Sequence, residues 1–221
     1  MALLTVGDLE RDHEVQVIIK MADEQLQRIG YTEHGQRHAR LVAHIAHNII
    51  DRLGYPARLA DLAAIAGYLH DIGNIVNRRE HGYAGAVMAM DVLRRLGMPI
   101  EEIAVVAGAV GNHDEETGEP VSEVSAAVII ADKSDVHHSR VRNPNPAKFD
   151  SHDRVNHAVQ HSFVRVDQER RVITLEVTVE DNMCRPADYF EIFMSRVQFI
   201  RRAAAFLNCE FELVMNNNRL L

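Results

Sequence analysis

The sequence predicts a mainly α-helical fold, with a helical bundle over residues 1–143 and a small ββαβ appendage of the α+β class over residues 144–221. Two observations carry this prediction. Apolar residues in the first part of the chain recur at the three- and four-residue spacing of amphipathic helices. Later in the chain apolar and polar residues alternate, which is the pattern of a strand with one buried face.

Glycine and proline residues mark the ends of the expected helices. Gly30, Gly54 and Gly97 each follow a segment with helical periodicity, while Pro56 and Pro99 each precede one. The segment after Pro56 is apolar on nearly all sides, so we expect it at the centre of the bundle. A Val-Ile-Ile run in the last segment could form a strand, but the surrounding alanines favour a buried helix. The expected helices cover residues 15–28, 31–54, 56–73, 80–97, 99–113 and 121–140.

The appendage begins with a loop over residues 143–153 that contains two Asn-Pro steps. A hairpin is expected over residues 162–181, because its apolar residues alternate with polar ones on either side of a turn at residues 167–170. An amphipathic helix over residues 186–207 and a closing strand over residues 209–216 complete the appendage.

Composition excludes several classes of protein. The chain has 221 residues and a net charge of −8, and this acidic balance argues against general binding to long nucleic acids or membranes. No apolar run approaches the roughly 20 residues of a membrane helix, and the N-terminal segment lacks the pattern of a signal peptide. Cys184 and Cys209 have no zinc-binding spacing and are expected to be buried free thiols. We therefore expect a cytoplasmic protein.

Histidine is frequent, with 13 residues, and several histidines and aspartates stand near the ends of expected helices. Such side chains can converge on one interior point of a bundle and hold metal ions. Histidines at helix ends could instead interact with the helix dipole. That alternative does not explain Asp71 or Asp132, because a carboxylate in an apolar setting is unfavourable without a nearby cation. The candidate ligands are His38, His70, Asp71, His81, His113 and Asp132.

These residues lie in segments that resemble the signature of the HD superfamily of metal-dependent phosphohydrolases. The core of that signature resembles HARLVA (38–43), LHDIG (69–73) and IADKSD (130–135). HGYAGA (81–86) and GNHDEETGEP (111–120) resemble the segments that add two histidines in the two-metal members of the HD-GYP branch. The resemblance implies an HD-domain helical bundle, six metal ligands, and an Asp71 carboxylate that bridges two ions.

The sequence also departs from the HD-GYP branch. Asn112 stands where that branch has the first histidine of a pair, and residues 118–120 read GEP in place of GYP. We therefore do not expect a cyclic di-GMP phosphodiesterase. His34 lies one helical turn before His38, so both side chains could face the same point. The role of His34 as a further ligand, a substrate contact or a supporting residue stays open at this stage.

The resemblance implies two divalent metal ions. Imidazole and carboxylate ligands without thiolates suit iron or manganese, with zinc, magnesium, nickel and cobalt as alternatives. Two such ions could hold a bridging hydroxide that attacks a phosphate group. We assign catalytic roles to Asp71 and to Lys133, which follows the candidate ligand Asp132. The expected substrate-binding residues are His34, Arg78, Arg79, Lys133, Asp135 and Arg140.

The function that fits these expectations best is a metal-dependent phosphohydrolase acting on a small phosphorylated molecule, such as a nucleotide or dinucleotide. One alternative is a di-iron oxygenase of the HD type, whose ligand set is similar. Another is a regulatory module that binds metal and ligand without turnover. The appendage could serve as a lid, a partner surface or the contact of a homodimer.

Overall fold

A computed structural model describes residues 3–180 and 186–221. The α-helices are α1 (Val6–Arg11), α2 (His13–Arg28), α3 (Gln36–Arg52), α4 (Ala57–Leu69), α5 (His81–Arg95), α6 (Ile100–Gly111), α7 (Glu123–Ser134), α8 (Ser151–Ala158) and α9 (Pro186–Phe206). The strands are β1 (Val159–Asp167), β2 (Val172–Val179), β3 (Glu210–Met215) and β4 (Asn218–Arg219), and short 3-10 helices are η1 (Ile72–Ile75), η2 (His138–Arg140) and η3 (Pro146–Lys148). The fold is thus mainly helical with a small C-terminal sheet, as the sequence predicted.

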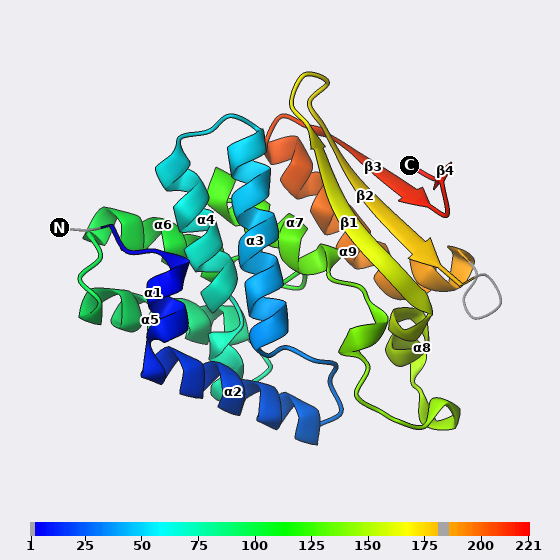
Figure 1. Cartoon of the computed structure of the whole chain (residues 1–221), viewed down its shortest axis with the longest axis horizontal. Helices are drawn as coiled ribbons and strands as arrows, with labels where there is room; N and C mark the ends of the chain where they lie inside the picture. The colour runs from blue at the N-terminus through cyan, green and yellow to red at the C-terminus, as the bar shows by residue number, and fades with distance from the viewer. Residues whose placement is uncertain (1–2, 181–185) are drawn as a thin grey trace.

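Helix α4 lies at the centre of the bundle (Figure 1) and packs against α3, α6 and α7. Its predicted burial on nearly all sides is confirmed, because nine of its residues are buried, from Ala60 to Leu69. Gly67 allows α3 to approach closely, since a Cβ atom there would lie 3.0 Å from the backbone of Ala43. The end of α4, which carries the HD pair, is therefore held by neighbours on several sides.

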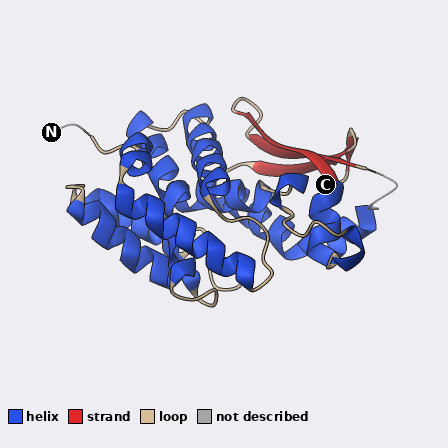
Figure 2. Cartoon of the chain, turned by 60° about the horizontal axis from the view of Figure 1, so that its bottom comes forward, coloured by secondary structure: helices blue, strands red, loops and turns tan. Residues whose placement is uncertain are grey.

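The appendage forms one four-stranded sheet in the order β1-β2-β3-β4. Strands β1 and β2 form the predicted hairpin, with Val166 opposite Ile173. Strand β3 then pairs with β2 in parallel, which requires a crossover connection. Helix α9 lies within that connection and covers one face of the sheet (Figure 2). It also packs against α7 of the bundle. The division at residue 143 stays a prediction.

Four local features differ from the sequence expectations. Helix α1 was not foreseen, and neither was the short strand β4. Helix α7 ends at Ser134 and not near residue 140, because the chain turns at Asp135, whose side chain is bound by His38 and Arg37. Part of the expected loop over residues 143–153 belongs to α8, which Asp150 caps by accepting a hydrogen bond from the Asp153 backbone N–H at 2.7 Å.

Two further expectations concern single residues and membranes. Cys209 is buried as a free thiol, whereas Cys184 lies outside the described residues. Within residues 3–180 and 186–221, no helix combines the length and apolar character that crossing a membrane would require.

Candidate metal centre

Four histidines and two aspartates from five helical segments meet inside the bundle, and we call this group the His/Asp cluster. They come from five places in the fold: the first turn of α3, the end of α4, which supplies two of them, the start of α5, the end of α6, and α7. The histidines are buried, and the aspartates are at most 12% exposed at their side chains. The members are His38, His70, Asp71, His81, His113 and Asp132, the same six residues that the sequence predicted as ligands.

One half of the His/Asp cluster surrounds the Nε2 atoms of His38 and His70, which lie 3.1 Å apart. Asp132 Oδ1 is 3.3 Å from His38 Nε2. On the other side, Asp71 Oδ2 is 3.2 Å from His70 Nε2. Two imidazole nitrogens and two carboxylate oxygens thus face a common point.

The other half surrounds the Nε2 atoms of His81 and His113, which lie 2.9 Å apart. Asp71 contributes its second oxygen here, with Oδ1 at 3.3 Å from His81 Nε2 and 3.8 Å from His113 Nε2. The single carboxylate of Asp71 therefore faces both halves of the cluster, one oxygen to each.

Each histidine binds an acceptor through Nδ1, on the side of the ring away from the cluster. His70 Nδ1 faces Gly67 O at 2.7 Å, and His113 Nδ1 faces Val110 O at 2.6 Å. A carbonyl accepts only from a protonated nitrogen, so these rings carry their proton on Nδ1 and present the Nε2 lone pair to the cluster. Metal-binding histidines are commonly held in this way.

The cluster fits a divalent cation. Lone pairs of neighbouring Nε2 atoms face each other at about 3 Å, an arrangement that a cation between them would stabilise. Asp71 Oδ2 is buried and has no hydrogen-bond donor among the described residues. Burial opposes ionisation of Asp71, yet the surrounding histidines, His70 first among them, hold the pKa of this carboxyl well below its usual range. Asp71 is therefore an ionised acceptor aimed into the cluster.

The backbone after α4 brings Asp71 close to α5. Gly73 packs so tightly against the start of α5 that a Cβ atom would lie 2.0 Å from His81 O. Asn74 then donates from Nδ2 to Asp71 Oδ1 at 2.7 Å and fixes the orientation of the carboxylate. A glycine two residues after Asp71 is thus what lets the HD pair and His81 meet.

Lys133 forms two ion pairs and does not point freely toward a substrate. Its Nζ is 2.7 Å from Asp132 Oδ2 and 2.5 Å from Glu115 Oε2. Burial opposes the charge of Lys133, but Asp132 and Glu115 raise the pKa of the ammonium above its ordinary value. Arg196 of α9 reaches the other oxygen of Glu115 at 3.5 Å. This geometry argues against the predicted catalytic and substrate contacts of Lys133 and indicates that it orients Asp132.

Asp135 and Arg140 also differ from their predicted role as substrate contacts. Asp135 Oδ2 accepts a hydrogen bond from His38 Nδ1 at 2.6 Å, on the side of the ring opposite the cluster. Arg37 donates to the same carboxylate. Arg140 is buried and donates to the backbone oxygens of Glu33 and Asp135. Both side chains are therefore occupied in holding His38 and the loop before α3.

His34 and Arg78 line a cavity near the cluster, and their role as substrate contacts stays a prediction. Arg78 Nη1 lies 3.9 Å from Asp71 Oδ1. The His34 ring is 5.4 Å from the His38 ring, and His34 lies outside the groups whose atoms could share a metal ion. Burial, followed by the nearby Arg140, lowers the pKa of His34 well below its usual value, so its ring is neutral. Arg79 is exposed, and its backbone N–H donates to Asn77 Oδ1.

Sequence reasoning missed the residues that support the cluster from a distance. Arg37 and Glu115 each stand close to a candidate ligand, so their position in the sequence gave a usable signal. Arg196, which reaches Glu115, lies in the appendage, far along the chain from any candidate ligand, and so does Asn156, which lines the neighbouring cavity. Neither residue stands in a recognisable motif.

A family model described as the HD domain matches residues 35–139. The HD domain model thus matches a little under half of the chain. The matched region contains every member of the His/Asp cluster. HD domains bind divalent metal ions, and the cluster offers the ligands for such a site.

The chain also resembles individual proteins. It is 30% identical over 114 residues to ribonuclease Y of Deinococcus radiodurans. The matched segment covers 52% of this chain and 19% of that protein. It is 33% identical over 104 residues to ribonuclease Y of Thermus thermophilus, covering 47% of this chain and 17% of that protein. This chain thus spans about a fifth of the length of these ribonucleases.

A longer match joins the chain to an uncharacterized protein of Methanocaldococcus jannaschii, with 27% identity over 189 residues, 75% of this chain and 72% of that protein. Among solved structures, a predicted HD superfamily hydrolase from an uncultured Thermotogales bacterium is similar with a TM-score of 0.46 and 26% identity. That match covers 61% of this chain and 75% of the other.

Proposed function

We propose that this protein is a metal-dependent phosphohydrolase that acts on a small phosphorylated molecule, with a nucleotide or dinucleotide as the expected substrate class. The observation that carries the proposal is the Asp71 carboxylate, which faces one histidine pair with each of its oxygens. This arrangement suits two metal ions that share one carboxylate, and the absence of thiolates in the ligand set suits iron or manganese. Segments similar to ribonuclease Y support chemistry on phosphoesters.

Divalent ions bound in the two halves of the cluster would lower the pKa of a coordinated water and neutralise charge on a phosphate group. The chain's own residues provide the remaining parts. Asp71 sets the separation of the two halves, and Lys133 holds Asp132 in place. Arg78 lies at the edge of the cluster and lines the nearby cavity, so its guanidinium can bind a phosphate oxygen.

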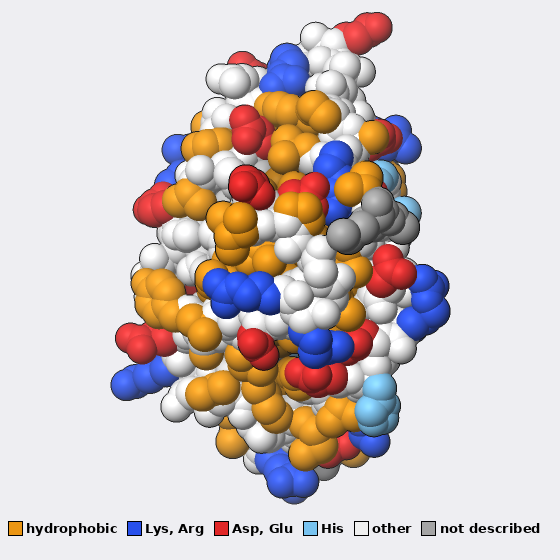
Figure 3. Space-filling model, turned by 90° about the vertical axis from the view of Figure 1, so that its left-hand side faces the viewer, with side chains coloured by type: hydrophobic (Ala, Val, Ile, Leu, Met, Phe, Trp, Pro, Cys, Tyr) orange, Lys and Arg blue, Asp and Glu red, His pale blue; other side chains and the backbone are white. Residues whose placement is uncertain are grey.

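A small substrate fits the electrostatics of the surface. The chain carries a net charge of −8, which disfavours the phosphate backbone of a long nucleic acid. Figure 3 shows one face on which acidic and basic side chains are interspersed with hydrophobic ones, without a continuous basic stripe. Near the cluster, two arginines, Arg78 and Arg196, line the same cavity.

The test starts with metal analysis of protein purified without oxygen, followed by phosphate release from a panel of nucleotides and dinucleotides. Asp71→Ala should lose both bound metal and phosphate release. The matched control is Asp91→Ala, which removes an exposed carboxylate on α5 and should leave both unchanged. Less than one metal ion per chain together with full activity in Asp71→Ala would refute the proposal. Turnover that requires dioxygen would favour the oxygenase alternative instead.

A further inference from the structure

A cavity of about 290 Å³ lies near the His/Asp cluster, and the appendage builds one of its walls. Arg78, which lines this cavity, connects it to the cluster, because its Nη1 is 3.9 Å from Asp71 Oδ1. The wall near the cluster comes from the loop between α2 and α3 and from Arg78. The opposite wall comes from α8 and α9, which lie outside the region matched by the HD family model. The polar side chains that the two walls contribute include His34, Arg78, Asp153, Asn156 and Arg196.

Among the residues that line this cavity, Asn156 has a buried side-chain acceptor without a hydrogen-bond donor in the described part of the chain. The residue is 3% exposed, and its Oδ1 has no donor among the described residues. Its Nδ2 donates to His152 O at 2.9 Å, which fixes the orientation of the amide, because the reverse orientation would set two oxygens against each other. A buried acceptor without a donor costs on the order of 1–3 kcal/mol. A ligand that donates to Oδ1 would remove that cost.

Each wall of the cavity contributes an arginine, and α8 adds hydrogen-bond acceptors to the appendage wall. Arg78 lies on the side of the cluster, within 3.9 Å of Asp71, and Arg196 reaches the cluster's supporting ion pairs through Glu115. Helix α8 contributes acceptors instead, with the carboxylate of Asp153 and the Oδ1 of Asn156. A ligand with a phosphate at one end and hydroxyl donors at the other matches this arrangement.

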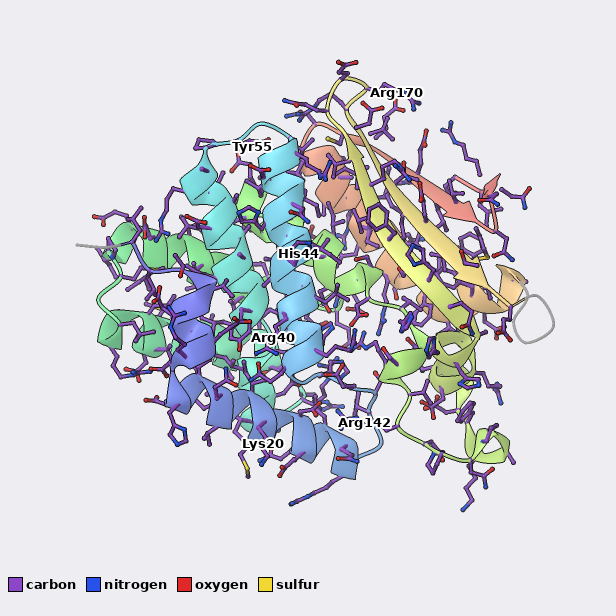
Figure 4. The ribbon with its side chains drawn as sticks, viewed as in Figure 1. Lys20, Arg40, His44, Tyr55, Arg142 and Arg170 are labelled. Atoms are coloured by element: carbon purple, nitrogen blue, oxygen red, sulfur yellow. The ribbon has the colours of Figure 1, made fainter. Side chains whose placement is uncertain are left out.

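The wall opposite α8 is held in place by ionic contacts. Arg142, labelled in Figure 4 near the end of α2, donates to Asp23. The same oxygen of Asp23 accepts the backbone N–H of His34 at 2.8 Å. Ligand pockets commonly measure ~300–1,000 Å³, so this cavity is at the lower limit of that range. It therefore suits one small molecule and not a dinucleotide.

We propose that Asn156 determines substrate specificity by accepting a hydrogen bond from a hydroxyl group of a polyhydroxylated phosphate monoester. A sugar phosphate and the ribose of a nucleoside monophosphate share this chemistry. The inference rests on the proposed phosphohydrolase function and narrows its substrate class. It also gives the appendage a role, since α8 supplies the residue that recognises the organic part of the substrate.

The test measures binding to the full, metal-loaded chain by calorimetry, with ribose 5-phosphate, adenosine 5′-monophosphate and inorganic phosphate as probes. Asn156→Ala should weaken binding of a hydroxyl-bearing probe about tenfold, the effect of one hydrogen bond. Binding of inorganic phosphate should stay unchanged. The two organic probes distinguish a sugar phosphate from a nucleotide, because the larger loss identifies the preferred class.

Asn156→Gln is the second variant, since it keeps an amide that can donate to His152 O and accept from a ligand, and it should retain selectivity between ribose 5-phosphate and inorganic phosphate better than Asn156→Ala. Thermal unfolding of both variants checks that they fold. Equal losses for inorganic phosphate and the organic probes, or no loss for any, would overturn the inference. Selective binding without phosphate release would instead refute the proposed phosphohydrolase function and leave the role of Asn156 standing.

Discussion

The hydrogen bond between His38 and Asp135 makes a sharp prediction about metal affinity. Asp135 Oδ2 lies 2.6 Å from His38 Nδ1 and 2.8 Å from an Arg37 nitrogen. Asp135→Asn preserves the shape of the side chain but removes its charge and replaces one acceptor oxygen with a donor. His38 then loses the partner that makes its Nε2 a stronger ligand.

The expected loss follows from this geometry. Removing a residue that supports a metal-binding histidine typically lowers metal affinity ~10–100-fold, or about 1.4–2.7 kcal/mol. Titration of the metal-free protein with Mn²⁺, in competition with a chelator of known affinity, measures the change. Glu176→Gln is the control, because it neutralises a carboxylate paired with Arg165 on the exposed side of the sheet and should leave affinity unchanged. A folded Asp135→Asn variant with the affinity of the native chain would refute the reasoning.

Three further predictions follow from the cluster and the bundle. Chelation of the metal should lower the unfolding temperature by roughly 5–10 °C when the free metal concentration is near 100 times the dissociation constant. Calorimetry with and without chelator measures this shift. An unchanged unfolding temperature would show that the cluster binds no metal in the folded state. Gly73→Ala should abolish metal binding and destabilise the fold by about 3 kcal/mol or more, since a Cβ would lie 2.0 Å from His81 O. Metal content and denaturant unfolding measure these two effects. A variant with full metal content would contradict the prediction. Arg58 lowers the pKa of Glu102 through a hydrogen bond, so the pair stabilises the fold above the unfolded-state pKa of Glu102 and loses this effect as the pH falls through the lower folded-state pKa. Glu102→Gln should therefore lower the free energy of unfolding by about 0.5–1 kcal/mol at pH 7, and the difference from the native chain should vanish in acid. Denaturant unfolding across this pH range measures the difference, and a difference that does not change with pH would argue against the ion pair.

The sequence was sufficient to predict most of the helices and the members of the His/Asp cluster, because both depend on short-range patterns. Helical periodicity and the glycines and prolines at its ends located α2 to α6. The resemblance to the HD signature identified the six cluster residues, and the structure brings them together. Their assignment as metal ligands stays a prediction until metal is measured.

The partners of charged side chains could not be read from the sequence. Lys133, Asp135 and Arg140 follow the last candidate ligand closely, so they were expected to face the substrate. In the structure α7 ends at Ser134, and Asp135 turns back toward His38, while Arg140 binds backbone oxygens before α3. These contacts join segments about a hundred residues apart, and local patterns carry no information about such pairings.

The ion pairs from Arg196 through Glu115 and Lys133 to Asp132 set an order of events during synthesis. During synthesis, the bundle helices emerge from the ribosome before α9 does, because they precede it in the chain. Asp132 can therefore reach its final electrostatic environment only after α9 has emerged and docked on α7. We expect the nascent bundle to capture metal weakly and the chain with docked α9 to retain it, so that tight metal loading would mark chains in which α9 has docked.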